Sequence, residues 1–406
     1  NGNVKNTAIG GLAGDAITDG NRNTLLGYTA GSAITSGQDN TAIGDQAYDA
    51  GTGSANTCVG QNCGGPMTGN DNTLMGVSAG ASLTDGPGNV LIGRSAGTAM
   101  TTSDYNVAIG WKAADAMVDS NYNIAIGSDA LGAEASGADN CLAIGVNALM
   151  LQNDASAVNV AVGNYAGDAI TSGKQHVLIG HQSGSALGSN DACTALGYQA
   201  LTAATGNSNT AIGAGAMTSA CSGSSNVAVG PSALASAANT ESHNVAIGNS
   251  ALAGLAHNDC DFNIAIGTDA GRYYETTATT IPGSSGPVDG VNNEGFKSIF
   301  IGYDTRSAET DRSNEIVIGH TAVSNGSNTI TLGNDDTAAI HCNDTSIAAL
   351  SDRRIKRDIT DNNVGLDFVE KLATVNYKRL NPADWPAEIR SHRYRVEEQQ
   401  ELVTPA

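Results

Sequence analysis

Aromatic side chains are scarce in this chain, at 4% of 406 residues, with only four phenylalanines and two tryptophans. A globular core of ordinary width is filled largely by aromatic and long aliphatic side chains, so the interior here must be narrow and filled by small and β-branched ones. A chain of this length would normally form two or three globular domains, but a narrow interior of this kind is what a thin β-solenoid requires.

Basic side chains are also scarce, and the net charge of −21 is unevenly distributed. Residues 1–350 hold 9 Lys and Arg against 30 Asp and Glu, whereas residues 351–406 hold 10 of each kind. An acidic surface repels phosphate backbones and anionic membranes, so we expect no nucleic-acid partner for the first segment. The change in charge balance predicts a junction between two different segments near residue 350.

Cysteine spacing and apolar runs exclude two further classes of protein. The seven cysteines lie at no metal-ligand spacing, and their odd number does not support a disulfide framework. These residues are Cys58, Cys63, Cys141, Cys193, Cys221, Cys260 and Cys342. No run of about 18 apolar residues occurs, so we expect no membrane insertion. We likewise expect no metal and no cofactor.

A five-residue motif, repeated about nineteen times, dominates the sequence. It consists of Asn, then Thr, Val or Ile, then a small or apolar residue, then Ile, Leu or Val, then Gly, as in Asn106-Val107-Ala108-Ile109-Gly110. Successive motif glycines between Gly10 and Gly267 are 16 to 19 residues apart. Sustained self-similarity at this period predicts one coil of a parallel β-roll or β-solenoid for each repeat.

The middle of each motif is expected to be a strand that is apolar on both faces. Positions two and four share one face, position three points the other way, and all three are mostly apolar. One face fills the interior of the coil; the other needs a second surface, most simply an identical chain. We expect a sister copy to cover the small middle side chain, and we expect the closed arrangement to be a homotrimer.

The second half of each coil carries a weaker pattern, with alanine three residues after the glycine, as at Ala13, Ala30 and Ala113. This pattern predicts a returning strand. Turn-forming residues such as Asp19-Gly20-Asn21 separate the coils and tolerate positive φ. Nineteen coils stacked at about 4.8 Å give a rod of about 85 Å.

The Asn-x-Ala-Ile-Gly motif with a following alanine resembles the parallel β-roll heads of trimeric autotransporter adhesins and the repeats of viral tail and capsid fibres. The resemblance covers residues 1–270 and again 298–333. It implies an all-β trimeric fibre, of phage type, located on a virion or outside the cell. We therefore predict a repeat shaft over 1–270.

The repeat is interrupted once, because 35 residues separate Gly267 from Gly302. The extra residues predict a loop over 271–297 that protrudes from the solenoid. Its first residues, Arg272, Tyr273 and Tyr274, have a composition suited to recognition, and we predict that they bind a host-surface receptor, a glycan or a protein. The alternative is a surface flap or a collar where the fibre changes width.

The pattern changes after the final coils and neck, predicted over 298–350. In the segment 351–406 we predict a short helix from Asn363 to Leu372 and a strand from Thr374 to Lys378. The Ser-Asp-x-Arg-x-Lys pattern from Ser351 to Lys356, with this helix and strand, resembles the endosialidase-type C-terminal intramolecular chaperone. That resemblance implies a small α+β module that directs trimerisation and then cleaves itself from the fibre.

By position, the resemblance implies that Ser351 is the nucleophile, Lys356 the base and Leu350–Ser351 the cleaved bond. A hydroxyl needs a base to attack a carbonyl, and lysine serves when neighbouring cations and burial lower its pKa. Without the resemblance, Ser351 would be interpreted as a turn or helix cap and Lys356 as a solvated side chain.

The leading functional hypothesis is therefore a structural virion fibre with a receptor-binding surface and a self-cleaving chaperone. A fibre-borne polysaccharide depolymerase is an alternative, although the repeats offer scattered turn aspartates and few aromatic platforms. A bacterial surface adhesin head is another. Calcium binding in the Asn/Asp turns is disfavoured because these are ordinary turn residues. Ice binding is disfavoured because threonine at position two alternates with valine and isoleucine, and because we expect it to face inward.

Overall fold

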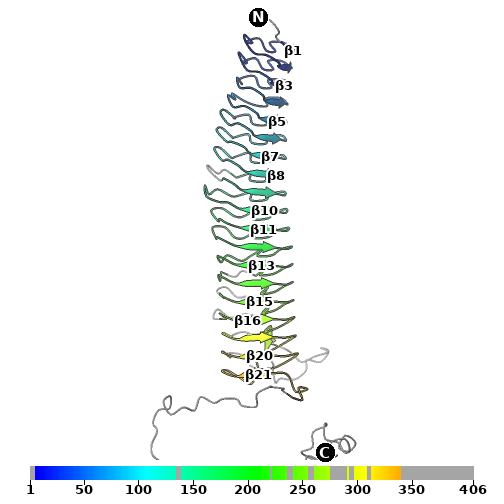
Figure 1. The fold of residues 1–406 in the computed structure, drawn as a ribbon, viewed down its shortest axis with the longest axis vertical. Helices are drawn as coiled ribbons and strands as arrows, with labels where there is room; N and C mark the ends of the chain where they lie inside the picture. The colour runs from blue at the N-terminus through cyan, green and yellow to red at the C-terminus, as the bar shows by residue number, and fades with distance from the viewer. Residues whose placement is uncertain are drawn as a thin grey trace, which may run out of the picture. The chain divides into compact units, whose positions relative to one another are not determined.

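The structure is a computed structural model that describes residues 5–133, 139–219, 222–235, 241–254, 260–274, 290–291, 297–308 and 312–339. These residues belong to one compact unit that ends at Ala339. They form an elongated stack of coils in which the strands lie directly above one another (Figure 1). The described residues contain strands and turns but no helix.

Each motif forms one strand of three residues. The insertion adds two further strands, each of two residues. The strands are β1 (Thr7–Ile9), β2 (Thr24–Leu26), β3 (Thr41–Ile43), β4 (Thr57–Val59), β5 (Thr73–Met75), β6 (Val90–Ile92), β7 (Val107–Ile109), β8 (Ile124–Ile126), β9 (Leu142–Ile144), β10 (Val160–Val162), β11 (Val177–Ile179), β12 (Thr194–Leu196), β13 (Thr210–Ile212), β14 (Val227–Val229), β15 (Val245–Ile247), β16 (Ile264–Ile266), β17 (Tyr273–Tyr274), β18 (Gly290–Val291), β19 (Ile299–Ile301), β20 (Ile316–Ile318) and β21 (Ile330–Leu332).

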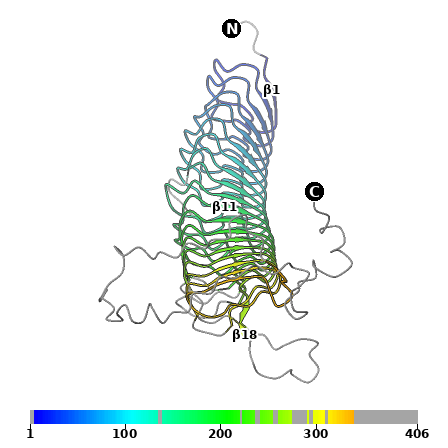
Figure 2. The ribbon, with the colours of Figure 1, turned by 60° about the horizontal axis from the view of Figure 1, so that its bottom comes forward.

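All strands except β17 and β18 form a single 19-stranded parallel sheet. Equivalent motif positions pair with one another, as Val107↔Ile124 and Ala108↔Ala125 do between β7 and β8. The prediction of an all-β parallel solenoid with about nineteen short coils is thus confirmed. Figure 2 shows the same stack tilted, with the strands of successive coils remaining aligned.

The returning strand predicted for the second half of each coil is wrong, because this part consists of turns, with only an isolated bridge between Arg306 and Val323 in the last coils. The backbone enters the left-handed region at alternate residues there, as at Lys112 (φ 54°) and Ala114 (φ 53°). Left-handed residues at every second position bend the chain continuously, so an extended strand cannot form.

The expected position of the middle residue was also wrong: it lies inside its own coil. Ala42, Leu91 and Phe300 at position three have no solvent-exposed surface, whereas positions two and four of the same strands are only partly buried. The narrow coil closes around this side chain because the turns return directly over the sheet, so no second chain is needed to cover it.

Within each coil, the side chains at motif position three and at the residue four places after the motif glycine fill the same part of the core. A leucine at position three occurs in coils that have glycine at the later position: Leu25 with Gly31, Leu74 with Gly80, Leu91 with Gly97, and Leu178 with Gly184. A Cβ added at Gly31 would lie 2.7 Å from Leu25 Cδ2, so the leucine occupies that space. Coils with alanine at position three often carry a larger buried residue instead, as Ala211 does with Met217.

Candidate functional site

The most extensive candidate for a functional surface lies on the outer face of the sheet. It is formed by the side chains at motif positions two and four, and we call it the outward stripe. Its members include Ile124, Val177 and Leu196, with 39, 41 and 44% of their surfaces exposed. At about 4.8 Å per row and about 7 Å between positions two and four, the stripe covers on the order of 600 Å². That is the upper end of the range for the largest apolar patch on a typical monomer, about 300–600 Å².

The threonines at position two face outward, so the expectation that they face inward is wrong. Threonine occupies position two in each of the first five strands, from Thr7 to Thr73. In β3 and β4 these threonines are partly exposed and the middle residue is buried. The reversal follows from the position of the core, because placing position three inside the coil puts positions two and four outside.

Aromatic side chains line both edges of the outward stripe. The residue before the motif Asn forms the N-edge column, and the residue after the motif Gly forms the C-edge column. The N-edge column contains Tyr105, Tyr122, His243 and Phe262; the C-edge column contains Tyr28, Trp111, His181, Tyr198, Tyr303 and His320. Several stack on the next coil, including Tyr105 on Tyr122, with ring centroids 5.6 Å apart and an interplanar angle of 9°.

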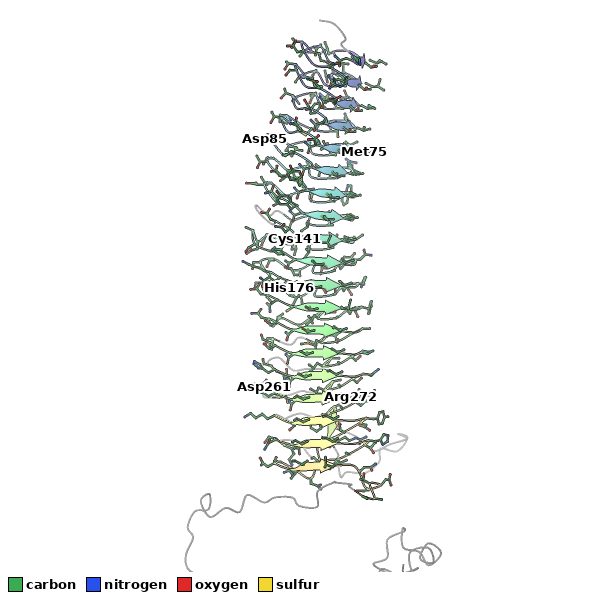
Figure 3. The ribbon with its side chains drawn as sticks, viewed as in Figure 1. Met75, Asp85, Cys141, His176, Asp261 and Arg272 are labelled. Carbon is green, nitrogen blue, oxygen red and sulfur yellow. The ribbon has the colours of Figure 1, made fainter. Side chains whose placement is uncertain are left out.

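Of the predicted receptor-binding residues, Arg272, Tyr273 and Tyr274 lie where the insertion leaves the stack. The Arg272 guanidinium forms an ion pair with Asp269, with Nη1 2.7 Å from Oδ1. The two tyrosines form β17, which pairs antiparallel with β18 at Gly290 and Val291. Because β16 pairs directly with β19, the residues between them add no row to the main sheet. Figure 3 shows Arg272 near the arrowhead end of the strands.

The predicted cleavage site cannot be placed in the same way, since Leu350, Ser351 and Lys356 lie outside the described residues. The predicted helix 363–372 and strand 374–378 lie outside them too. Within the described ranges, no group of three or more His, Cys, Asp or Glu side chains could hold a metal ion. No helix in those ranges is long and apolar enough to cross a membrane.

Inside the coils, the motif asparagines form a hydrogen-bonded ladder that the sequence analysis did not predict. In most rows the backbone N–H of one asparagine donates to Oδ1 of the asparagine in the preceding coil, at 2.8 to 3.0 Å. The Nδ2 group commonly donates to a backbone carbonyl at the end of its own coil, as Asn106 does to Ser120 at 2.8 Å. These amides are almost fully buried, so the ladder satisfies the polar groups that the narrow core would otherwise leave unpaired.

His176 replaces asparagine in one row and reproduces both of its hydrogen bonds. Its Nδ1 accepts the backbone N–H of Cys193 at 3.1 Å, and its Nε2 lies 2.7 Å from the carbonyl oxygen of Asn190. This arrangement requires a neutral ring with the proton on Nε2. Burial lowers the pKa of His176, although the two backbone hydrogen bonds and Asp191 oppose the shift. Figure 3 shows His176 on the same side of the stack as Cys141, opposite Met75.

Acid should weaken the fold at His176, and replacing it with asparagine should remove the effect. As the pH falls below the ordinary histidine pKa of 6.5, His176 becomes protonated in the unfolded chain at a higher pH than in the folded chain, because folding lowers its pKa. The free energy of unfolding therefore falls as the pH drops below that value, by up to about 1.4 kcal/mol per pH unit for one proton. Denaturation of wild type and His176→Asn across this range should show a smaller loss in the variant.

The exposed His181→Asn variant is the matched control for the acid effect and should follow the wild-type profile. If the wild type and His176→Asn showed parallel profiles from pH 7 to pH 5, the buried histidine would not be the source of any acid sensitivity.

Comparison with known proteins adds no assignment: no model of a known protein family matches this chain, and no curated protein shows significant sequence similarity to it.

Proposed function

We propose that the chain forms a trimeric virion fibre, of tail or capsid, whose surface binds a host receptor. The observation that carries the proposal is the outward stripe, which continues in one register through the sheet and is uncovered in a single chain. Its rows repeat at the coil spacing. Only a partner with the same repeat can contact every row, and another copy in parallel orientation has that repeat.

The area of the stripe also supports association between copies. On the order of 600 Å² from the stripe, together with its edge columns, approaches the roughly 800 Å² that each partner contributes to a stable interface. The resemblance to adhesin heads and viral fibres adds the three-fold arrangement. The insertion, with Arg272, Tyr273 and Tyr274 at its base, remains the proposed receptor-binding element, and the receptor is a glycan or a protein.

The C-terminal segment is proposed to direct trimerisation and then to cleave itself between Leu350 and Ser351. Parallel coils of similar sequence are prone to slip by one repeat, because most contacts survive the shift. A separate module that aligns three chains before the coils pair would prevent this error.

Both halves of the proposal are tested with the full chain and the Ser351→Ala variant. We expect sedimentation to give a trimer for both proteins. On a denaturing gel the wild type should lose residues 351–406, whereas the variant should keep them because it lacks the hydroxyl nucleophile. A monomer would contradict the fibre, and identical band sizes for the two proteins would contradict self-cleavage.

A second candidate is an ice-binding surface, which the outward threonines from Thr7 to Thr73 favour. The two candidates place opposite demands on the stripe, since ice binding needs it exposed and trimerisation covers it. A monomer that produces thermal hysteresis would favour ice binding, whereas a trimer without hysteresis would favour the fibre.

A further inference from the structure

We propose that in the trimer Trp111 of one copy packs against the stacked rings of Tyr105 and Tyr122 of the next copy, forming a seam that fixes the register. This inference rests on the proposed trimer and specifies which residues meet. Among the described rows, only that of β7 carries an aromatic side chain at both edges of the stripe, Tyr105 before the strand and Trp111 after it.

These side chains are available for a partner in the single chain. Tyr105, Tyr122 and Trp111 expose 54, 58 and 51% of their surfaces. The Tyr105 ring extends over Gly88 in the preceding coil, where an added Cβ would lie 2.5 Å from Cδ1. The two tyrosine rings thus span the heights of β6 to β8. A tryptophan at the height of β7 would lie at the middle of this span.

The width of the sheet places these residues where copies should meet. Facing sheets pack about 10 Å apart, so each of three sheets around an axis lies about 5 Å from it. A triangle of that size has sides of about 17 Å, which five extended residues span at about 3.4 Å each. Asn106 to Gly110 fill one side, and Tyr105 and Trp111 then lie at its two corners. In a three-fold arrangement, the C-edge of one copy meets the N-edge of the next at each corner.

Charge at the two edges is complementary as well. The exposed Arg94 lies in the C-edge column one row before Trp111 and forms no ion pair among the described residues. The Lys112 ammonium lies 5.1 Å from the Trp111 ring centroid. At the N-edge, Asp104 precedes Tyr105 and is partly exposed. A neighbouring cation would pair with that carboxylate.

Such a seam would distinguish the correct register between copies from a slipped one, which the stripe alone does poorly. A slip of one coil replaces valine or isoleucine on the stripe by another apolar residue and preserves most contacts, so the stripe sets register weakly. The same slip would move Trp111 along the tyrosine pair and separate Arg94 from Asp104. An aromatic pair contributes about 0.5–1.5 kcal/mol beyond its buried area, and the seam would occur three times in each trimer.

Disulfide cross-linking of the full chain tests the seam. In the Tyr105→Cys/Trp111→Cys variant, six extended residue steps, about 20 Å, separate the new thiols within one chain. A disulfide needs Cα atoms about 4.4–6.8 Å apart, so this pair can form only between copies. We expect mild oxidation to give a covalent trimer as the largest species on a non-reducing gel. Both positions should tolerate cysteine, since the same columns elsewhere contain Ala55 and Ser128.

The matched control is Tyr105→Cys/Tyr198→Cys, which joins β7 to β12 and places the thiols five rows, about 24 Å, apart along the axis. It should give no more cross-linking than the wild type, whose native cysteines report the background. The Tyr122→Cys/Trp111→Cys pair provides a second test at the same corner.

The outcomes separate the seam from the trimer itself. If sedimentation gives a trimer but neither corner pair cross-links above background, the seam is wrong and the trimer stands. If the variants and the wild type are monomers, both are wrong. A covalent dimer as the end product, or equal cross-linking of the control pair, would also overturn the seam, because the copies would then lack either the three-fold arrangement or a fixed register.

Discussion

Replacing Gly213 with alanine should lower the free energy of unfolding by about 3 kcal/mol or more, since two costs add. Gly213 has a φ of 134°, a region that is accessible almost only to glycine. A Cβ there would lie 2.6 Å from both the carbonyl carbon and oxygen of Gly230 in the next coil. The rows would have to separate, which would weaken the 2.7 Å hydrogen bond from Gly230 N–H to the Ile212 carbonyl.

Because each coil is stabilised by its neighbours, a defect at one interface should divide the stack. Chemical denaturation of Gly213→Ala should show a lower midpoint and a loss of two-state behaviour, and limited proteolysis should cut near residue 213. The control lies in the same coil: Gly215 has a φ of 66° and no atom closer than 3.7 Å to an added Cβ. The equivalent residues Asn62 and Asn147 adopt similar angles.

Gly215→Asn should therefore change stability by no more than about 0.5 kcal/mol. Equal losses from the two glycine variants would show that the close approach of the motif glycines is not what makes glycine necessary.

The repeat period and the coil count could be predicted from the sequence because both depend on local, recurring features. Every motif places an apolar triplet between an asparagine and a glycine, and the stack pairs equivalent positions in register. Which face of the triplet points inward could not be predicted from alternation alone, since both faces are apolar. The answer depends on how the turns close, and the left-handed residues that close them, such as Lys112 and Ala114, are not residue types that signal positive φ.

The same limit explains why the sequence analysis expects position three, and not positions two and four, to face a second copy. Alanine at position three suggested a tight contact between copies. In the structure it instead leaves room for a larger residue in the turn, such as Met217 beside Ala211 in the same coil. A comparison of side-chain volumes at these two positions across the repeats would have revealed that both belong to one core.

The asparagine ladder was missed although the sequence contains its signal. Asparagine recurs at position one while positions two to four vary, which indicates a role that apolar packing does not explain. The exceptions reinforce this interpretation: besides His176, Cys193 donates its thiol to the Gly206 carbonyl at 3.3 Å and Ser298 accepts the backbone N–H of Glu315 at 3.2 Å. Burial raises the pKa of Glu315, and Ser324 donates to its Oε1 at 2.7 Å.

Replacing Asn106 with leucine should lower the free energy of unfolding by about 2–6 kcal/mol, because it removes two buried hydrogen bonds at about 1–3 kcal/mol each. The Asn106 Oδ1 accepts the backbone N–H of Asn123 at 2.9 Å, and its Nδ2 donates to the Ser120 carbonyl at 2.8 Å. Leucine supplies neither bond, and the ladder side chains of this row are inaccessible to water. Thermal and chemical denaturation of the purified variant would measure the loss.

Asn121→Ser is the matched control, because it alters a second and less buried line of hydrogen bonds on the next coil. Asn121 Oδ1 accepts the backbone N–H of Asp104 at 2.7 Å, and serine accepts the equivalent bond elsewhere, as Ser54 does from Gln38 at 3.1 Å. We expect this variant to stay within about 0.5 kcal/mol of the wild type. If Asn106→Leu were as stable as Asn121→Ser, water must reach the interior of the coil at this row. The ladder would then be a consequence of the repeat geometry and not one of the interactions that hold the stack together.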